Sequence, residues 1–230
     1  MTRKIIALDW HATIRLHKII YMTYPIYLFL VGFGMSQILI IPFSLWMALS
    51  CAANPFAAEE KGEFNQLFLT LPISRYQIVK ARFIFSLVMM LIGIAVGVAF
   101  VPIVRYFSSY LWSFWPVSLW YIGFEGYVAI TGVSVLLFAI LHIFMFPFLY
   151  KMGYQRGKIL GVYLPAVLFG FLFISYSVRM MVSARNFTFE YLILARENML
   201  LVCSVLFALS ALLLFVSYKL SQKIYSKRDL

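Results

Sequence analysis

Six apolar stretches recur along the chain and are separated by shorter polar connections. Their approximate limits are 19–33, 35–56, 83–104, 128–150, 159–178 and 199–218. A helix needs about 20 mostly apolar residues to cross the hydrocarbon core of a bilayer, and only the first stretch is clearly shorter than that. The pattern predicts an all-α membrane protein with six transmembrane helices. We expect residues 1–230 to form a single transmembrane domain.

Glycines in two places indicate how neighbouring helices meet. Gly32 and Gly34 lie where the first two apolar stretches meet, and there they predict a tight reversal and a hairpin of adjacent helices. Gly93 and Gly97 form a G-x-x-x-G pattern in the third stretch, which lets another helix approach closely. We expect that helix to belong to the same chain and not to a second copy.

Composition and charge support insertion in a membrane and not binding to nucleic acid. Hydrophobic residues make up 64% of the chain and charged residues only 12%. The net charge is +11, but the basic residues occur in small groups between apolar stretches, without the aromatic interleaving of a nucleic-acid surface. If the N-terminus is cytoplasmic, 15 of the 19 basic residues lie on the cytoplasmic side. We therefore expect a multi-pass protein of the plasma membrane with both termini in the cytoplasm and a retained N-terminus.

The segment before the first apolar stretch, residues 1–18, has the spacing of an amphipathic helix. Lys4, His11, Arg15 and Lys18 fall on one face, and Ile6, Trp10 and Ile14 fall on the other. This pattern predicts a helix that lies in the cytoplasmic interface with its apolar side in the lipid boundary. Both a membrane anchor and a docking role remain open for it.

A polar segment, residues 59–82, lies between the second and third apolar stretches and begins with three of the eight acidic residues. Phe64, Leu67, Phe68 and Leu71 recur at i, i+3, i+4 and i+7, which predicts one apolar face on a short helix. The same short helix carries the acidic residues Glu60 and Glu63. Pro72 ends it, because proline disfavours helix at the preceding residue and lacks an amide hydrogen.

A second helix is predicted to begin directly after this proline. Ser74 is placed to cap the amide of Gln77, and Gln77 is placed to return the contact, as in a capping box. This helix continues into the third apolar stretch, and its basic residues Arg75, Lys80 and Arg82 are expected near the lipid headgroups. The segment is thus a short interfacial helix, a corner and a long helix that enters the membrane.

The 59–82 segment resembles a known family. The sequences EEKGE at 59–63 and LFLTLPISRYQIVKAR at 67–82 are similar to permease subunits of the type-2 ATP-binding-cassette exporter family. The six-span layout with an N-terminal interface helix is similar as well. The resemblance implies that the segment contains a cytoplasmic coupling helix between spans 2 and 3, which docks on a separate ATPase. The matching residues are Glu60, Glu63, Phe64, Leu67 and Phe68 in the coupling helix and Pro72, Ser74 and Arg75 in the turn into the third span.

Other chemical motifs are weak. The sequence from Gly153 to Ile159 contains a glycine–lysine pair, but its glycine spacing is one residue short for a phosphate-binding loop and Ile159 replaces the required Ser or Thr. Cys51 and Cys203 fit no metal or redox spacing and are expected to be free thiols. His142 is the one histidine within an apolar stretch, where a proton path and simple packing are alternatives; packing is favoured. We expect no catalytic, cofactor or metal site and no enzymatic activity in this chain.

The resemblance implies a permease subunit of an ATP-driven exporter in a bacterial cell membrane. It would act as a homo- or heterodimer with two cytosolic ATPase subunits, which would bind the ATP and Mg²⁺. Few fixed charges lie in the apolar stretches, and 23 Phe and 11 Met suit an amphipathic peptide or other hydrophobic cargo. A secondary transporter or channel, and a membrane sensor or assembly subunit without transport, are the alternatives.

Overall fold

The computed structural model describes residues 2–16, 18–34, 39–60, 74–111, 124–159, 163, 167, 170, 171 and 198–227. Its elements there are the helices α1 (Thr2–Leu16), α2 (Lys18–Gly34), α3 (Ile40–Ala52), α4 (Asn54–Glu60), α6 (Arg75–Leu111), α7 (Phe124–Lys158) and α10 (Met199–Ser226). These described ranges contain no strand, which confirms the all-α prediction.

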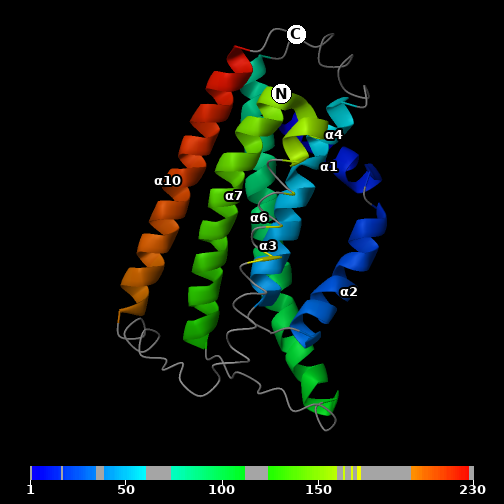
Figure 1. The fold of residues 1–230 in the computed structure, drawn as a ribbon, viewed down its shortest axis with the longest axis vertical. Helices are drawn as coiled ribbons and strands as arrows, with labels where there is room; N and C mark the ends of the chain where they lie inside the picture. Colours follow the sequence, from blue (N-terminus) through cyan, green and yellow to red (C-terminus); the bar gives the residue numbers. More distant parts are fainter. Residues whose placement is uncertain are drawn as a thin grey trace.

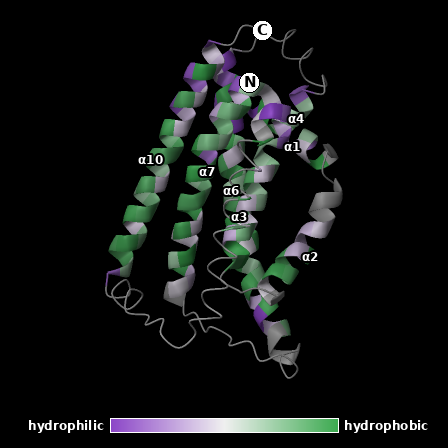
Figure 2. Ribbon diagram, viewed as in Figure 1, coloured by the Kyte–Doolittle hydropathy of each residue, from purple (hydrophilic) through white to green (hydrophobic). Residues whose placement is uncertain are grey.

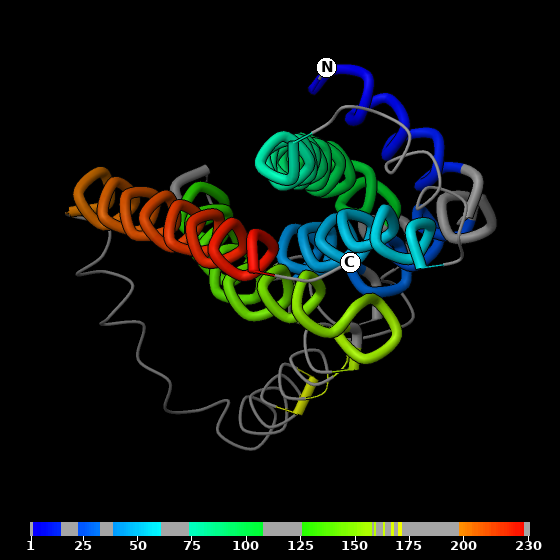
Figure 3. Tube along the Cα trace, turned by 90° about the horizontal axis from the view of Figure 1, so that it is seen from above, coloured from blue at the N-terminus to red at the C-terminus, as the bar shows by residue number. Residues whose placement is uncertain are grey.

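The long helices run side by side and alternate in direction (Figure 1). α2 and α6 run away from the end of the bundle that holds both termini, whereas α3, α7 and α10 run toward it. α3 lies between α6 and α7, as the view along the bundle in Figure 3 also shows. The two termini therefore share one end of the bundle, which we call the terminal end. Which side of the membrane this end faces stays a prediction.

Four stretches of helix are long and apolar enough to cross a bilayer. They are Ile40–Glu60, Arg75–Phe107, Gly126–Gly157 and Met199–Ser226. They confirm the second, third, fourth and sixth predicted spans as long apolar helices. α2 contains a shorter apolar helix, Thr23–Gly32, at the first predicted span. The fifth predicted span falls mainly outside the described residues, so the total of six stays a prediction.

Small residues let α3 pack closely on α6. A Cβ atom on Gly93 would lie 2.9 Å from the Cβ of Ala48, and one on Gly97 would lie 3.1 Å from the Cα of Ile41. Ser44 on α3 also donates a hydrogen bond to the carbonyl of Gly93 at 2.6 Å. The predicted close approach at the G-x-x-x-G pattern is confirmed, and the partner helix belongs to the same chain.

We expect the substitution Gly93→Ala to destabilise the fold by about 1–3 kcal/mol, because an added methyl group overpacks a filled contact. The measurement is the unfolding temperature of the purified protein in detergent. Gly170→Ala is the matched control, since a Cβ there would meet no heavy atom of the described residues within 4 Å. Equal unfolding temperatures for the two variants would contradict the close α3–α6 contact.

The α7–α10 pair encloses the intramembrane histidine. His142 on α7 is fully buried, and its Nδ1 lies 2.9 Å from the hydroxyl of Ser217 on α10. Its ring stacks on Phe146 at 3.8 Å between centroids and meets the ring of Phe83 edge-on at 5.5 Å. The favoured prediction of a packed histidine is confirmed.

Polar residues gather at the terminal end of the bundle, as the hydropathy colouring in Figure 2 shows. Along the long helices the exposed side chains are mainly apolar, and on α10 Leu200 is 90% exposed and Leu201 is 64% exposed. Exposed apolar faces of this kind suit contact with lipid chains. In the described part of the chain, the long helices thus expose mainly apolar surface, and polar residues are concentrated at the terminal end.

Candidate functional site

The short helix α4 (Asn54–Glu60) closes the terminal end of the bundle. Pro55 is its second residue, a position where the missing amide hydrogen of proline is not needed for the helix. The side chains from Asn54 to Ala58 are buried. Phe56 packs edge-on against Phe146 and Tyr150 of α7, at 5.7 Å and 4.8 Å between ring centroids. Helix α4 is therefore anchored in the bundle, and its two last residues, both glutamates, are held near α6 and α7.

Arg82 is the centre of a buried ionic cluster at this end. It lies on the face of α6 that also buries Ile78, Val79 and Phe85, and its side chain is 1% exposed. Its Nη1 donates a hydrogen bond to Oε2 of Glu59 at 2.6 Å. The guanidinium carbon also lies 4.4 Å from the centroid of the Phe56 ring, within the range of a cation–π contact. The arginine thus ties α6 to α4 through both a charge and an aromatic ring.

Asp9 brings the N-terminal helix α1 (Thr2–Leu16) into the same cluster. It is 2% exposed and shares a buried face of α1 with Ile5, Ala12 and Thr13. Burial raises the pKa of Asp9 to about 6, because removal from water disfavours the charged carboxylate. Arg82 opposes this increase in the pKa and Glu59 adds to it. Helix α1 packs against both α4 and α6, so the three helices meet at the Arg82 cluster.

We expect wild-type stability to fall relative to Asp9→Asn as the pH rises from about 4 to about 6. The pKa of Asp9 is about 6 in the folded protein against an ordinary value of 3.8. The folded state therefore retains the proton of Asp9 to higher pH than the unfolded state does. The resulting contribution to the free energy of unfolding is fully present below about pH 4 and is lost as the pH rises through about 6. The difference corresponds to about 3 kcal/mol. Unfolding temperatures measured at several pH values test this.

Asp229→Asn is the control for the loss of one aspartate from the chain. Its unfolding temperature should follow that of the wild type at each pH. If Asp9→Asn and the wild type have parallel pH profiles, the burial of Asp9 among these helices is wrong.

Glu60, the last residue of α4, contacts α7 at a break in that helix. Gly153 has φ 77° and ψ 178°, a left-handed backbone conformation that favours glycine and interrupts the helical hydrogen bonds. The backbone amide of Gln155, just after the break, donates to Oε2 of Glu60 at 2.8 Å. The carboxylate thus accepts a hydrogen bond from a backbone group next to the interruption. The end of α4 is linked in this way to α7 as well as to α6.

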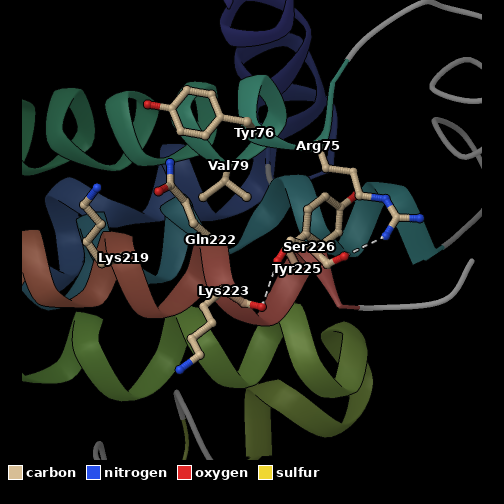
Figure 4. A pocket seen from close by; sticks show the side chains of 8 residues that line it. All are labelled: Arg75, Tyr76, Val79, Lys219, Gln222, Lys223, Tyr225 and Ser226. Atoms are coloured by element: carbon tan, nitrogen blue, oxygen red, sulfur yellow. Dashed lines mark hydrogen bonds between the residues drawn. The ribbon is translucent and has the colours of Figure 1, made fainter.

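The start of α6 contacts the end of α10. The hydroxyl of Ser74 accepts a hydrogen bond from the amide of Gln77 at 3.4 Å, which confirms Ser74 as the cap of α6. Arg75 follows it and donates to the carbonyl of Ser226 at 3.3 Å (Figure 4). From this cap, α6 continues for 37 residues, to Leu111. The predicted continuous helix from the polar segment into the third span is confirmed.

The comparison with protein families identifies the chain. Residues 5–226 match the family model described as ABC-2 family transporter protein. The chain belongs to the ABC-2 transporter family. No curated protein and no solved structure matches it. Members of this family are membrane permease components and not the catalytic subunits of a transporter.

Three of the eight predicted site residues of the ABC-2 permease lie in the described part of the chain. Glu60 contacts α7, Ser74 caps α6, and Arg75 contacts α10. The other five lie outside the described residues, and their predicted roles are not tested: Glu63, Phe64, Leu67, Phe68 and Pro72. The structure therefore shows what lies on either side of the predicted coupling helix.

The position expected for Arg82 was wrong. It was predicted near the lipid headgroups, but its side chain is buried against Glu59 and Phe56. A signal for this was present, because Ile78, Val79 and Phe85 precede and follow Arg82 at spacings of three and four residues on one helical face. Asp9 was missed as well, although it is the one acidic residue of α1 and lies four residues after Ile5. A functional account of this ABC-2 permease therefore has to explain why Arg82 and Asp9 are buried.

Proposed function

We propose that this chain is the permease subunit of an ATP-driven exporter and works as a dimer with two separate ATPase chains. Membership of the ABC-2 family and the multi-pass helical architecture support the proposal. In this proposal the ATP and Mg²⁺ are bound by the partner ATPase, since the sequence from Gly153 to Ile159 departs from a phosphate-binding loop. The permease provides the path through the membrane, and the ATPase provides the free energy.

The observation that carries the proposal is the junction around Arg82. The 59–82 segment begins at the end of α4 and ends in the first turns of α6, and Glu59 and Arg82 join these two ends by an ion pair at 2.6 Å. Asp9 adds α1 to the junction, and Glu60 adds α7. A force applied to the segment would therefore act on several helices together and not on a loose loop.

Helix α6 is long enough to transmit a movement of the 59–82 segment across the membrane. A helix of 37 residues is about 55 Å long, more than the about 30 Å of the hydrocarbon core. In the proposed cycle, ATP binding closes the ATPase pair, moves the segment and tilts α6, which changes the side of the membrane to which the path opens. ATP shifts this equilibrium only if it binds one of the two states more tightly than the other.

The proposed cargo is an amphipathic peptide or another hydrophobic molecule. Within the described residues, the charged groups of the spans lie toward helix ends or in the cluster around Arg82. An ionic cargo crossing the bundle would need fixed charges as partners in a medium of low dielectric constant. Aromatic and aliphatic walls favour a cargo that is itself largely apolar.

Co-purification with an ATPase encoded beside this chain tests the proposal. We expect a complex of two permease and two ATPase chains whose ATP hydrolysis in proteoliposomes changes when the permease is present. The permease purified alone should hydrolyse no ATP. A stable, folded permease that neither binds an adjacent ATPase nor alters its activity would contradict the proposal and favour a secondary transporter or a sensor.

A cargo panel tests the finer part of the proposal. Amphipathic peptides should stimulate ATP hydrolysis by the complex in proteoliposomes, and they should accumulate in inside-out vesicles only when ATP is added. Polar peptides of the same length and charge are the control. Equal stimulation by both classes would contradict the proposed cargo while leaving the ATPase partnership intact.

A further inference from the structure

A groove opens between the first residues of α6 and the last residues of α10, at the terminal end of the bundle (Figure 4). Its volume is about 330 Å³. It is lined by Arg75, Tyr76, Val79, Lys219, Gln222, Lys223, Tyr225 and Ser226. Three of these residues are basic and none is acidic, so the groove has the charge of an anion site.

The basic groups at the groove come from both helices, Arg75 from α6 and Lys219 from α10. Arg75 and Lys219 lie at opposite ends, and Tyr76 and Gln222 lie between them (Figure 4). Lys223 extends on the side of α10 away from α6. Arg75 is oriented by its hydrogen bond to the carbonyl of Ser226 at 3.3 Å. An anion in the groove would therefore be approached by cations from two helices that are distant in sequence.

The position of the groove along the helices matches the depth of lipid headgroups. α10 has 28 residues and is about 42 Å long, so roughly its last two turns extend beyond an about 30 Å hydrocarbon core. Those turns contain the α10 residues of the groove. The ring of Tyr76 also lies 6.5 Å from that of Tyr218, and tyrosine rings are typical of the membrane–water boundary.

An apolar strip continues from the groove into the membrane. Leu212, Phe215 and Val216 precede Lys219 by seven, four and three residues, so they share its face of α10. Their side chains are 58%, 59% and 36% exposed. The Lys219 amino group lies 5.5 Å from the centroid of the Phe215 ring, so its stem follows the same strip. The site thus presents basic groups at one end and exposed apolar surface below them.

We propose that this groove binds the phosphate headgroup of an anionic phospholipid whose acyl chains lie along the strip on α10. Basic pockets between spanning helices suit such headgroups. A free phosphate would use the basic residues but not the strip, which is why the geometry points to a lipid. The bound lipid would join the start of α6 to the end of α10. This proposal rests on the fold and is independent of the proposed export function.

The experiment compares lipid binding by the full-length protein in detergent, measured by native mass spectrometry during titration with phosphatidylglycerol. The groove variant is Arg75→Gln with Lys219→Gln. The control variant is Lys4→Gln with Lys151→Gln, which removes two exposed charges outside the groove. We expect the groove variant to bind phosphatidylglycerol about 30-fold more weakly, since each basic residue near an anionic lipid contributes about fivefold in affinity. The control variant should bind like the wild type.

Two further measurements distinguish a lipid headgroup from a free phosphate as the bound anion. Phosphatidylcholine should bind the wild type more weakly than phosphatidylglycerol, and soluble glycerol phosphate should not displace the lipid at matched concentration. The unfolding temperature of each variant without lipid is measured first, and Lys219→Gln alone replaces the double variant if the latter unfolds early. Equal loss of binding in the groove and control variants, equal binding of the two lipids, or displacement by glycerol phosphate would overturn the proposal.

Discussion

Replacing Arg82 with methionine is expected to lower the stability of the folded protein by about 3–5 kcal/mol. Removing one partner of a buried ion pair leaves the remaining charge without compensation in a medium of low dielectric constant. Here two carboxylates lose the same cation: Glu59, which is 16% exposed, and Asp9, which is 2% exposed. The measurement is the unfolding temperature of the protein in detergent, together with its yield from membranes.

Lys80→Met is the matched control, since Lys80 is exposed and lies two residues before Arg82 on α6. It should change stability by no more than about 0.5 kcal/mol. In a chain that already carries Glu59→Gln and Asp9→Asn, Arg82→Met should cost much less, because no buried carboxylate is then left unpaired. If Arg82→Met costs as little as Lys80→Met in the wild-type background, the buried cluster is wrong.

The double change Phe64→Ala with Leu67→Ala is expected to weaken ATPase binding by about 100-fold. In the predicted coupling helix these residues share one apolar face, and the loss of two buried anchors of this size corresponds to roughly 3 kcal/mol of binding free energy. ATP hydrolysis coupled to the permease should fall with it. Affinity is measured with the purified ATPase and the permease in nanodiscs.

Asn65→Ala with Gln66→Ala is the control, because these residues lie in the same predicted helix but off its apolar face. The control should retain wild-type affinity and activity. The unfolding temperature of the variant lacking Phe64 and Leu67 is measured as well, and a wild-type value separates a loss of docking from a loss of folding. Full affinity in that variant would remove the docking role from this face of the helix.

Much of the bundle could be predicted from the sequence because its determinants are local. A span is recognised from a run of apolar residues, and the close α3–α6 contact follows from glycines spaced by four, where no side chain can intervene. The start of α6 was equally local, because a serine two residues after a proline predicts both the end of one helix and the cap of the next. These signals need no knowledge of distant residues.

The ionic cluster could not be predicted in the same way, because its members are distant in sequence. Arg82, Glu59 and Asp9 come from three helices, and the buried charge of Arg82 is compensated by carboxylates that are distant from it in sequence. Taken alone, an arginine near a membrane boundary is expected to reach the headgroups, which is why the prediction for Arg82 was wrong. Its spacing on the buried face of α6 was the better guide.

The N-terminal helix shows the same limit. Its presence and its exposed residues Trp10 and Ile14 agree with the predicted interfacial helix. The sequence pattern gave this helix one basic face and one apolar face. It did not indicate the third face, on which Ile5 and Asp9 are buried. That face contacts α6 and α4, so the helix is packed on the bundle in addition to any contact with lipid. A narrow buried face that contains one acidic residue can be recognised in the sequence only when the partner helix is known.

The most direct test of the central claim is site-specific photocrosslinking in the assembled complex. A photoreactive amino acid at position 64, in the predicted coupling helix, should capture the ATPase subunit. The same amino acid at position 106, near the opposite end of α6 and in place of the exposed Tyr106, should not. Capture of the ATPase from position 64 alone is the predicted result. An intact, active complex in which position 64 captures no ATPase would contradict the claim that the 59–82 segment docks on the ATPase and couples ATP hydrolysis to the permease.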